Sequence, residues 1–232
     1  MNQKQNNKKW EQYGEIRNLG RNILALPHHR KRLLTFLDFF SQLPTDLKIL
    51  DIGCASGLNL TLLFHLGFED IEGIDLVPQF VERARRLNLN VRQADLFQYQ
   101  SEHKYDVVIC TEVLEHLEDP ELALKRIREF LKEEGIIYLS VPVYDSVKWR
   151  VRRLLFKETR ELHSKLHDET HINAFSWRSV KRLLERNNFE IFFRVIYWNP
   201  LPKIGENILG RFLNKLFPQL GDFLIIGAKK KS

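Results

Sequence analysis

The sequence is poor in cysteine and contains no long apolar run. Cys54 and Cys110 are the only cysteines among 232 residues, and each follows a short apolar run, which argues for packing in a reducing compartment and against a disulfide framework. No apolar run approaches the roughly 18 residues that a membrane-spanning helix needs. Residues 1–20 are polar and lack the apolar core of a signal peptide. We therefore expect a cytoplasmic protein with a polar tail over residues 1–20.

The composition also argues against several classes of protein. Hydrophobic residues make up 44% and charged residues 28% of the chain, which is ordinary for a soluble globular domain and unlike a disordered or membrane-spanning chain. The length suits one large α/β domain, so residues 21–232 are predicted to form a single domain. The net charge of +6 is compatible with phosphate-rich partners or an anionic membrane surface but demonstrates neither.

Short apolar runs alternate with helical segments along most of the chain. Continuous apolar strands separated by helices predict a parallel sheet covered on both faces, which is a doubly wound α/β fold. Two further strand-like segments near the C-terminus predict an antiparallel end to the sheet. Strands are expected at residues 49–52, 71–74, around Val91, 105–110, 135–143, 189–198 and 221–230, and helices at 21–42, 58–66, 80–87 and 121–132, the last capped by Asp119 and ended by Gly135.

A cluster of small residues follows the first predicted strand. In "LDIGCASGL" the turn from Gly53 to Gly57 lacks large side chains, so its backbone can approach a ligand closely. Asp75 closes the second strand, where a carboxylate can accept both hydroxyls of a ribose, and Asp95 follows the third strand. Because ligands of doubly wound sheets bind beyond the carboxyl ends of the strands, these positions predict a nucleoside site. A nicotinamide dinucleotide is the rival ligand, but "GCASGL" departs from the G-x-G-x-x-G fingerprint.

Several motifs together resemble those of a known family. "LDIGCASG", "GIDLVPQFVERAR", "ADLF" and "YDVVICTEVLEHLEDPELALKRIREFLKEEGIIYLSVP" are similar to the successive motifs of class I S-adenosylmethionine-dependent methyltransferases. "THINAFSWRSVKRLLERNNFEI" resembles the segment that follows in the small-molecule branch, near the ubiquinone-biosynthesis O-methyltransferases. The resemblance implies a mostly parallel seven-stranded sheet with helices on both faces and a C-terminal antiparallel strand. It also implies methyl transfer from S-adenosylmethionine to a small-molecule acceptor.

The same resemblance assigns residues to the cofactor. Asp51 and the turn after it would approach the methionine part, and Asp75 would hold the ribose. Asp95 with Leu96 would read the adenine, against which Leu76 would pack. The full predicted cofactor set is Asp51, Gly53, Cys54, Ala55, Gly57, Asp75, Leu76, Asp95, Leu96 and Thr111.

The segment after the fourth predicted strand carries the candidate chemistry. His116 in "EVLEHLEDP" would lie at the rim of the crevice and is a natural general base for an acceptor hydroxyl, although a capping or packing histidine fits equally well. Glu112, Glu115 and His116 stand at i, i+3 and i+4, so one turn of helix would place them on one face. This pattern resembles the E-x-x-E-H cluster by which small-RNA 2′-O-methyltransferases bind a divalent cation, with His171 as the implied further ligand. The predicted catalytic residues are His116, Glu115 and His171, and the predicted cation ligands are Glu112, Glu115, His116 and His171.

Two inserts are expected around the acceptor entrance, a helical one at about residues 146–170 and an amphipathic one at about 204–217. Their apolar and cationic faces would suit an apolar acceptor or a peripheral membrane contact. His163, His167 and His171 recur every four residues, which is more typical of a helix face than of a row of metal ligands. Two other functions stay open. One is RNA methylation, which the net charge and the E-x-x-E-H pattern favour, and the other is a cofactor-binding partner subunit without turnover.

Overall fold

A computed structural model of the chain describes residues 27–144, 170–197 and 221–231. The predicted tail, the insert at 204–217 and all but the last residue of the insert at 146–170 lie outside these ranges. Within them, no helix is both long and apolar enough to cross a membrane.

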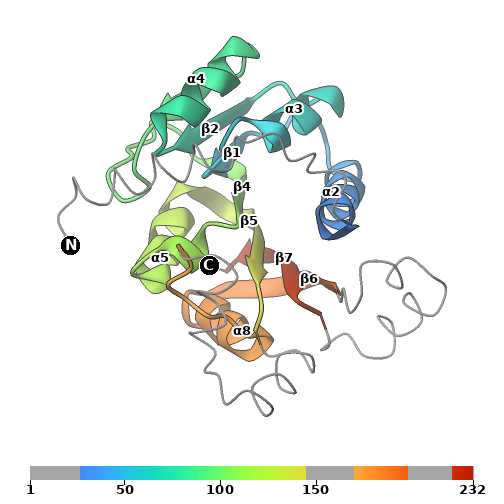
Figure 1. Cartoon of the computed structure of the whole chain (residues 1–232), viewed down its shortest axis with the longest axis vertical. Coiled ribbons are helices and arrows are strands. Elements are labelled where there is room, and N and C mark those ends of the chain that lie inside the picture. Colours follow the sequence, from blue (N-terminus) through green and yellow to red (C-terminus); the bar gives the residue numbers. More distant parts are fainter. Residues whose placement is uncertain (1–26, 145–169, 198–220, 232) are drawn as a thin grey trace.

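The described residues form a seven-stranded sheet in the order β3-β2-β1-β4-β5-β7-β6 (Figure 1). β7 pairs antiparallel with both β5 and β6, whereas all the other pairs are parallel. This arrangement confirms the predicted doubly wound, mostly parallel sheet with an antiparallel C-terminal strand. The strands are β1 (Ile49–Ile52), β2 (Ile71–Asp75), β3 (Val91–Gln93), β4 (Tyr105–Thr111), β5 (Leu131–Pro142), β6 (Phe189–Tyr197) and β7 (Phe223–Lys230).

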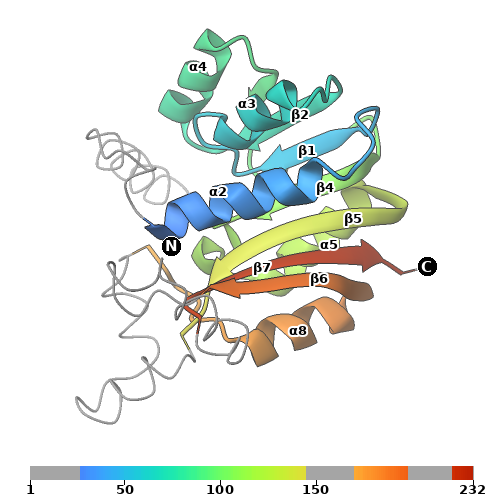
Figure 2. The same cartoon turned by 90° about the vertical axis from the view of Figure 1, so that its right-hand side faces the viewer.

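Helices cover both faces of the sheet (Figure 2). Phe36, Phe39 and Phe40 of α2 pack on one face, where their ring centroids lie 5.5, 4.9 and 5.3 Å from that of Tyr138 in β5. α5 and α8 bury their apolar sides in a second core on the opposite face. The helical elements are α2 (Pro27–Phe40), α3 (Leu58–His65), α4 (Pro78–Arg86), the 3-10 turn η2 (Leu114–His116), α5 (Pro120–Phe130) and α8 (Trp177–Arg186).

The boundary between α5 and β5 differs from the prediction. The N-cap is confirmed, since the Asp119 side chain accepts a hydrogen bond from the Leu122 N–H at 2.9 Å. The prediction that Gly135 ends the helix is wrong, because the helix ends at Phe130 and Gly135 lies inside β5. Leu131 is buried and pairs with the first residue of β4, so burial of this side chain draws the chain into the sheet four residues early.

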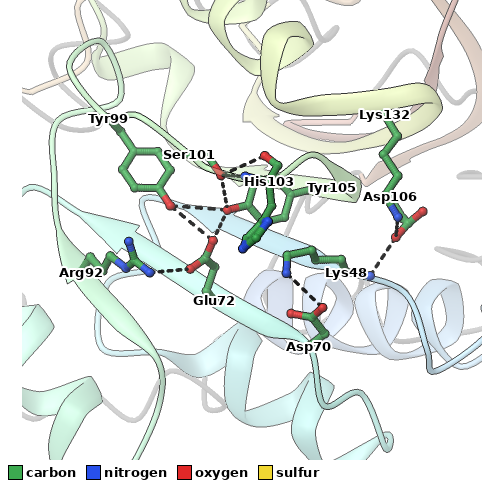
Figure 3. Close-up of polar contacts among 10 residues, drawn as sticks. All are labelled: Lys48, Asp70, Glu72, Arg92, Tyr99, Ser101, His103, Tyr105, Asp106 and Lys132. Carbon is green, nitrogen blue, oxygen red and sulfur yellow. Dashed lines mark hydrogen bonds and ion pairs between the residues drawn. The ribbon is translucent and has the colours of Figure 1, made fainter.

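Polar side chains at the amino ends of the strands form hydrogen bonds and ion pairs with one another (Figure 3). Asp106 accepts hydrogen bonds from the Lys48 backbone N–H at 2.9 Å and from Lys132 Nζ at 2.8 Å. Glu72 accepts a hydrogen bond from the Tyr105 hydroxyl, and burial together with this bond raises the pKa of that hydroxyl above its ordinary value. These contacts link β4 to β5, to the residue before β1 and, across β1, to β2.

Candidate active site

The turn after β1 is built from residues with left-handed backbone. Gly53, Ala55 and Gly57 have φ values of 68°, 48° and 84°. A Cβ added at Gly53 would lie 2.4 Å from Cγ2 of Val113, so the turn packs directly on the segment after β4. Two N–H groups at the start of the turn donate to the Ile74 carbonyl oxygen at 2.8 and 3.1 Å. The turn is therefore fixed between the ends of β2 and β4.

Asp75, at the end of β2, is bound to this turn. Its Oδ2 accepts the Ala55 N–H and its Oδ1 accepts the Val77 N–H, each at 2.8 Å. The residue is 8% exposed, and burial raises the pKa of its carboxyl group although the N–H donors act in the opposite direction. A carboxylate can accept about four hydrogen bonds, and the backbone N–H groups of Ala55, Leu76 and Val77 act on this one, so it retains acceptor capacity for a ribose hydroxyl.

Asp51 is a fully buried acid at the carboxyl edge of the sheet. It is 0% exposed, and its Oδ2 has no hydrogen-bond partner among the described residues. The Asn59 side-chain Nδ2 lies 3.4 Å from Asp51 Oδ1 and 3.2 Å from Thr111 Oγ1, and so bridges β1 to β4. The pKa of Asp51 is raised to about 8, chiefly by burial; the Asn59 hydrogen bond acts to lower it and the nearby Asp75 carboxylate acts to raise it. A buried carboxyl oxygen without a partner is costly unless a ligand supplies the donor.

The remaining predicted cofactor residues differ in the burial and the contacts of their side chains. Asp95 follows β3, and its Oδ1 accepts the Phe97 N–H at 2.8 Å. Leu96 is buried in the core, whereas Leu76 is only partly buried and so keeps side-chain surface for a ligand. The Cys54 side chain is buried, and burial raises the pKa of its thiol, so it stays neutral and contributes packing.

Glu112 does not lie where the sequence predicted it. The expected helical turn over residues 112–116 is wrong, because only Leu114–His116 form a 3-10 turn and Glu112 precedes it with a φ of 56°. The Glu112 carboxylate instead accepts a hydrogen bond from Ser140 Oγ at 2.8 Å and lies 3.6 Å from Arg32 Nη1. It does not belong to the cluster formed by the other predicted cation ligands.

The other three predicted residues do come together. One donor atom each from Glu115, His116 and His171 lies within 4.8 Å of the others. The two imidazole rings have centroids 4.8 Å apart and planes at 60°. Glu115 and His171 are buried and His116 is partly buried. His163 and His167 lie outside the described residues.

Backbone hydrogen bonds attach the His171 segment to η2. The Ile172 and Asn173 N–H groups donate to the Glu115 carbonyl oxygen at 2.9 and 3.0 Å. The Asn173 side-chain amide donates to the Leu117 carbonyl oxygen at 2.5 Å. Residues more than fifty positions apart in the sequence thus meet at one place, which explains why spacing alone could not group them correctly.

Three residues near these groups are absent from the sequence prediction. Asn59 bridges Asp51 and Thr111, and its only signal is a polar side chain inside the apolar segment "LNLTLLF". Tyr144 places its hydroxyl 3.0 Å from His171 Nδ1, and Thr170 contacts His116. Tyr144 lies in none of the quoted motifs. Thr170 begins the segment "THINAFSWRSVKRLLERNNFEI", but the resemblance assigned it no role, because its contact with His116 arises from the pairing of distant segments.

Comparison with known proteins gives matches over most of the chain. A family model described as "Methyltransferase domain" matches residues 26–192. A Ubiquinone biosynthesis O-methyltransferase of Rickettsia bellii is 31% identical over 102 residues, 41% of this chain and 42% of that protein. One from Neisseria meningitidis is 28% identical over 142 residues, 56% of each chain. The chain therefore spans about half the length of the curated relatives it matches.

A solved structure has the same fold over nearly its full length. The N-methyltransferase NodS from Bradyrhizobium japonicum, in complex with S-adenosyl-l-homocysteine, superimposes with a TM-score of 0.66 and covers 96% of this chain and 98% of that one. The two sequences are 18% identical. At this level of identity the likeness is one of fold.

Proposed function

The chain belongs to the methyltransferase-domain family, and we propose on this basis that it transfers a methyl group from S-adenosylmethionine to an oxygen atom of a small molecule. The observation that carries the proposal is the set of carboxyl groups around the turn after β1. Asp51, Asp75 and Asp95 lie in or just beyond three neighbouring parallel strands, at the sheet edge where doubly wound folds bind nucleotides.

Each of these groups has a part that suits the cofactor. The unpartnered Oδ2 of buried Asp51 would meet the positively charged methionine end, and Asp75 would accept the ribose hydroxyls. The glycine at position 53 lets the turn pack directly against Val113, which holds the backbone of the turn beside the ends of β2 and β4. The bound cofactor supplies a methyl group that its sulfonium sulfur already activates, so the protein has to orient the acceptor and exclude water.

Oxygen is favoured as the acceptor atom by two observations. The curated relatives of R. bellii and N. meningitidis are O-methyltransferases at 31% and 28% identity. In addition, His116 lies in η2, five residues after Thr111, the last residue of β4 and of the predicted cofactor set. His116 Nε2 would take the proton from the acceptor hydroxyl as the oxygen attacks the methyl carbon, and would later release it to water. The neighbouring Glu115 carboxylate would favour the imidazolium.

The same cluster has the donor atoms for a divalent cation. Glu115, His116 and His171 offer a carboxylate oxygen and two imidazole nitrogens within 4.8 Å of one another, a donor set that suits first-row divalent metals. A bound cation would supply a Lewis acid for the acceptor oxygen. We include this cation in the proposal as the alternative to a metal-free general base. Full turnover in excess EDTA, with no metal in the purified protein, would reject it.

Transfer of a labelled methyl group tests the proposed function. The full chain is incubated with S-[methyl-³H]adenosylmethionine and metabolite extracts, and label is expected in an organic-soluble product. At a cofactor concentration below saturation, Asp75→Ala should lower transfer at least about tenfold, whereas Asp70→Ala, at the exposed amino end of β2, should retain it. Label that appears only in a ribonuclease-sensitive fraction would replace the small molecule by RNA. Cofactor binding without transfer to any fraction would favour a partner subunit without turnover.

Location and partners belong to this proposal too. We propose a cytoplasmic protein that contacts membranes peripherally through its two inserts, which lie outside the described residues. Flotation of the purified chain with vesicles of phosphatidylcholine and phosphatidylserine tests the contact, and chain that stays at the bottom of the gradient would exclude it.

A further inference from the structure

Two oxygen atoms of Thr170 meet one ring nitrogen of His116. The Thr170 carbonyl oxygen lies 3.2 Å from His116 Nδ1, and the hydroxyl Oγ1 lies 3.0 Å from the same atom. A carbonyl oxygen can only accept a hydrogen bond, so it favours the tautomer that carries the hydrogen on the nitrogen facing it. In a neutral imidazole with hydrogen on Nδ1, the lone pair is on Nε2.

Thr170 is held firmly enough to impose this choice. It is 7% exposed, and the residues that follow it are bound to η2 through the Glu115 carbonyl oxygen. The Asn173 side chain adds a hydrogen bond to the carbonyl oxygen of Leu117. The two carbonyl groups that accept these hydrogen bonds, those of Glu115 and Leu117, lie one residue to either side of His116.

The second histidine has its own support. The Tyr144 hydroxyl lies 3.0 Å from His171 Nδ1, and the Tyr144 backbone N–H donates to the Phe175 carbonyl oxygen at 2.8 Å. Neither of these two contacts involves Thr170, so a substitution of Thr170 leaves both of them in place. The charged and titratable groups that face His116 from the described elements are Glu115 and His171.

We propose that Thr170 is a positioning residue, which holds the hydrogen of His116 on Nδ1 and thereby directs the Nε2 lone pair toward the acceptor. The side-chain hydroxyl shares this hydrogen with the carbonyl, so that the imidazole cannot turn or change tautomer without losing both partners. The role of Thr170 in turnover rests on the proposed function, whereas the position of the hydrogen on His116 does not depend on it. The two can therefore fail separately.

Nitrogen NMR of the full chain measures the tautomer directly. Long-range ¹H–¹⁵N spectra of protein labelled at histidine distinguish a protonated from an unprotonated ring nitrogen, and a His116→Gln variant identifies its signals among the eight histidines. The spectra are recorded near pH 8.5, about two units above the ordinary histidine pKa of about 6.5. We expect hydrogen on Nδ1 of His116 in the natural protein and in Thr170→Ser, and a mixture of tautomers in Thr170→Val.

Kinetics then connect the tautomer to turnover. We expect Thr170→Val to lower kcat about tenfold. This is the low end of the roughly 10- to 100-fold range for loss of a group that orients a histidine, because the Thr170 backbone carbonyl remains as a partner. KM for S-adenosylmethionine should not change, and Thr170→Ser should restore most of kcat. Hydrogen on Nε2 in the natural protein would overturn the proposal, and this outcome requires no variant to fold. An unchanged tautomer and unchanged kcat in Thr170→Val would overturn it as well.

Failure of the proposed function gives a different result. A chain that does not bind S-adenosylmethionine in calorimetry would contradict the methyltransferase proposal, whatever the His116 spectrum shows. A chain that binds and transfers, but carries the hydrogen on Nε2, would contradict only the role of Thr170.

Discussion

The Asp75 carboxylate accepts a hydrogen bond from the Ala55 backbone N–H across 2.8 Å, so the end of β2 and the turn after β1 form one unit. The acid that is expected to hold the ribose therefore also fixes the turn that surrounds the ligand. Loss of Asp75 should affect both the binding of the cofactor and the shape of its site.

Asp75→Ala should weaken S-adenosylmethionine and S-adenosylhomocysteine binding by roughly 10- to 150-fold, because hydrogen bonds to a charged group contribute about 1.5–3 kcal/mol. Isothermal titration calorimetry measures the change. Asp70→Ala is the matched control, since Asp70 precedes the same strand at its other end and is 59% exposed at its side chain. Equal loss of affinity in both variants would contradict the assignment of the ribose to Asp75.

Cofactor binding should release a proton from Asp51. Its pKa of about 8 means that the carboxyl group is largely protonated at pH 7 in the ligand-free chain. A positively charged methionine end beside this group favours the carboxylate, so affinity should rise from pH 6 to pH 8. Calorimetry at pH 7 in phosphate and in Tris should give different apparent enthalpies because the buffers take up the proton differently. Asp51→Asn should remove that difference, and identical enthalpies in both buffers with the natural chain would contradict the prediction.

The same carboxyl group should make the ligand-free chain less stable as pH rises. The folded-state pKa of Asp51 lies above its ordinary value of 3.8, so between about pH 4 and pH 8 the folded chain keeps a proton that the unfolded chain has released. The contribution is fully present below pH 4, decreases toward pH 8 and is then constant. Burial raises the Asp75 pKa as well and acts with the same sign. The free energy of unfolding, measured with urea from pH 5 to pH 8, should fall more steeply with pH for the natural chain than for Asp51→Asn. An equal fall in the two chains would contradict the prediction.

Ala55→Gly should stabilise the chain by about 0.5–1 kcal/mol. Ala55 has a φ of 48°, and a left-handed backbone costs roughly 1–2 kcal/mol for a residue with a side chain, against about 0.5–1 kcal/mol for the greater flexibility of glycine in the unfolded chain. Urea midpoints measure the difference. Ala123→Gly, inside α5, should change stability in the opposite direction. A decrease in both variants would show that Ala55 is not strained.

Gly53→Ala should destabilise the chain by about 1–3 kcal/mol. The substitution combines a φ of 68° with a Cβ placed 2.4 Å from Val113 Cγ2. A double-mutant cycle separates the two causes. Val113→Ala removes the methyl group that collides, so the cost of Gly53→Ala should be smaller in that background. Additive effects would assign the whole cost to the backbone.

The fold and part of the site follow from sequence patterns. The apolar runs predicted the strands, since a parallel strand buried on both faces has to be apolar throughout. Asp51, Asp75 and Thr111 lie at the carboxyl edge as expected, because parallel topology brings the ends of neighbouring strands together. The predicted helical turn over residues 112–116 was wrong, because periodicity does not reveal that Glu112 adopts a positive φ and contacts Ser140 and Arg32.

The sequence by itself determined the order of strands and helices and the chain positions of the acids, because both depend on local composition and on the regular geometry of a parallel sheet. Only the tertiary structure decided that Glu112 leaves the cluster while Glu115, His116 and His171 form it. It also decided that Thr170 meets His116, which is 54 positions away in the chain. Such contacts depend on how residues 170–173 pair with η2, and hydrogen bonds between distant segments leave no periodic pattern in the chain.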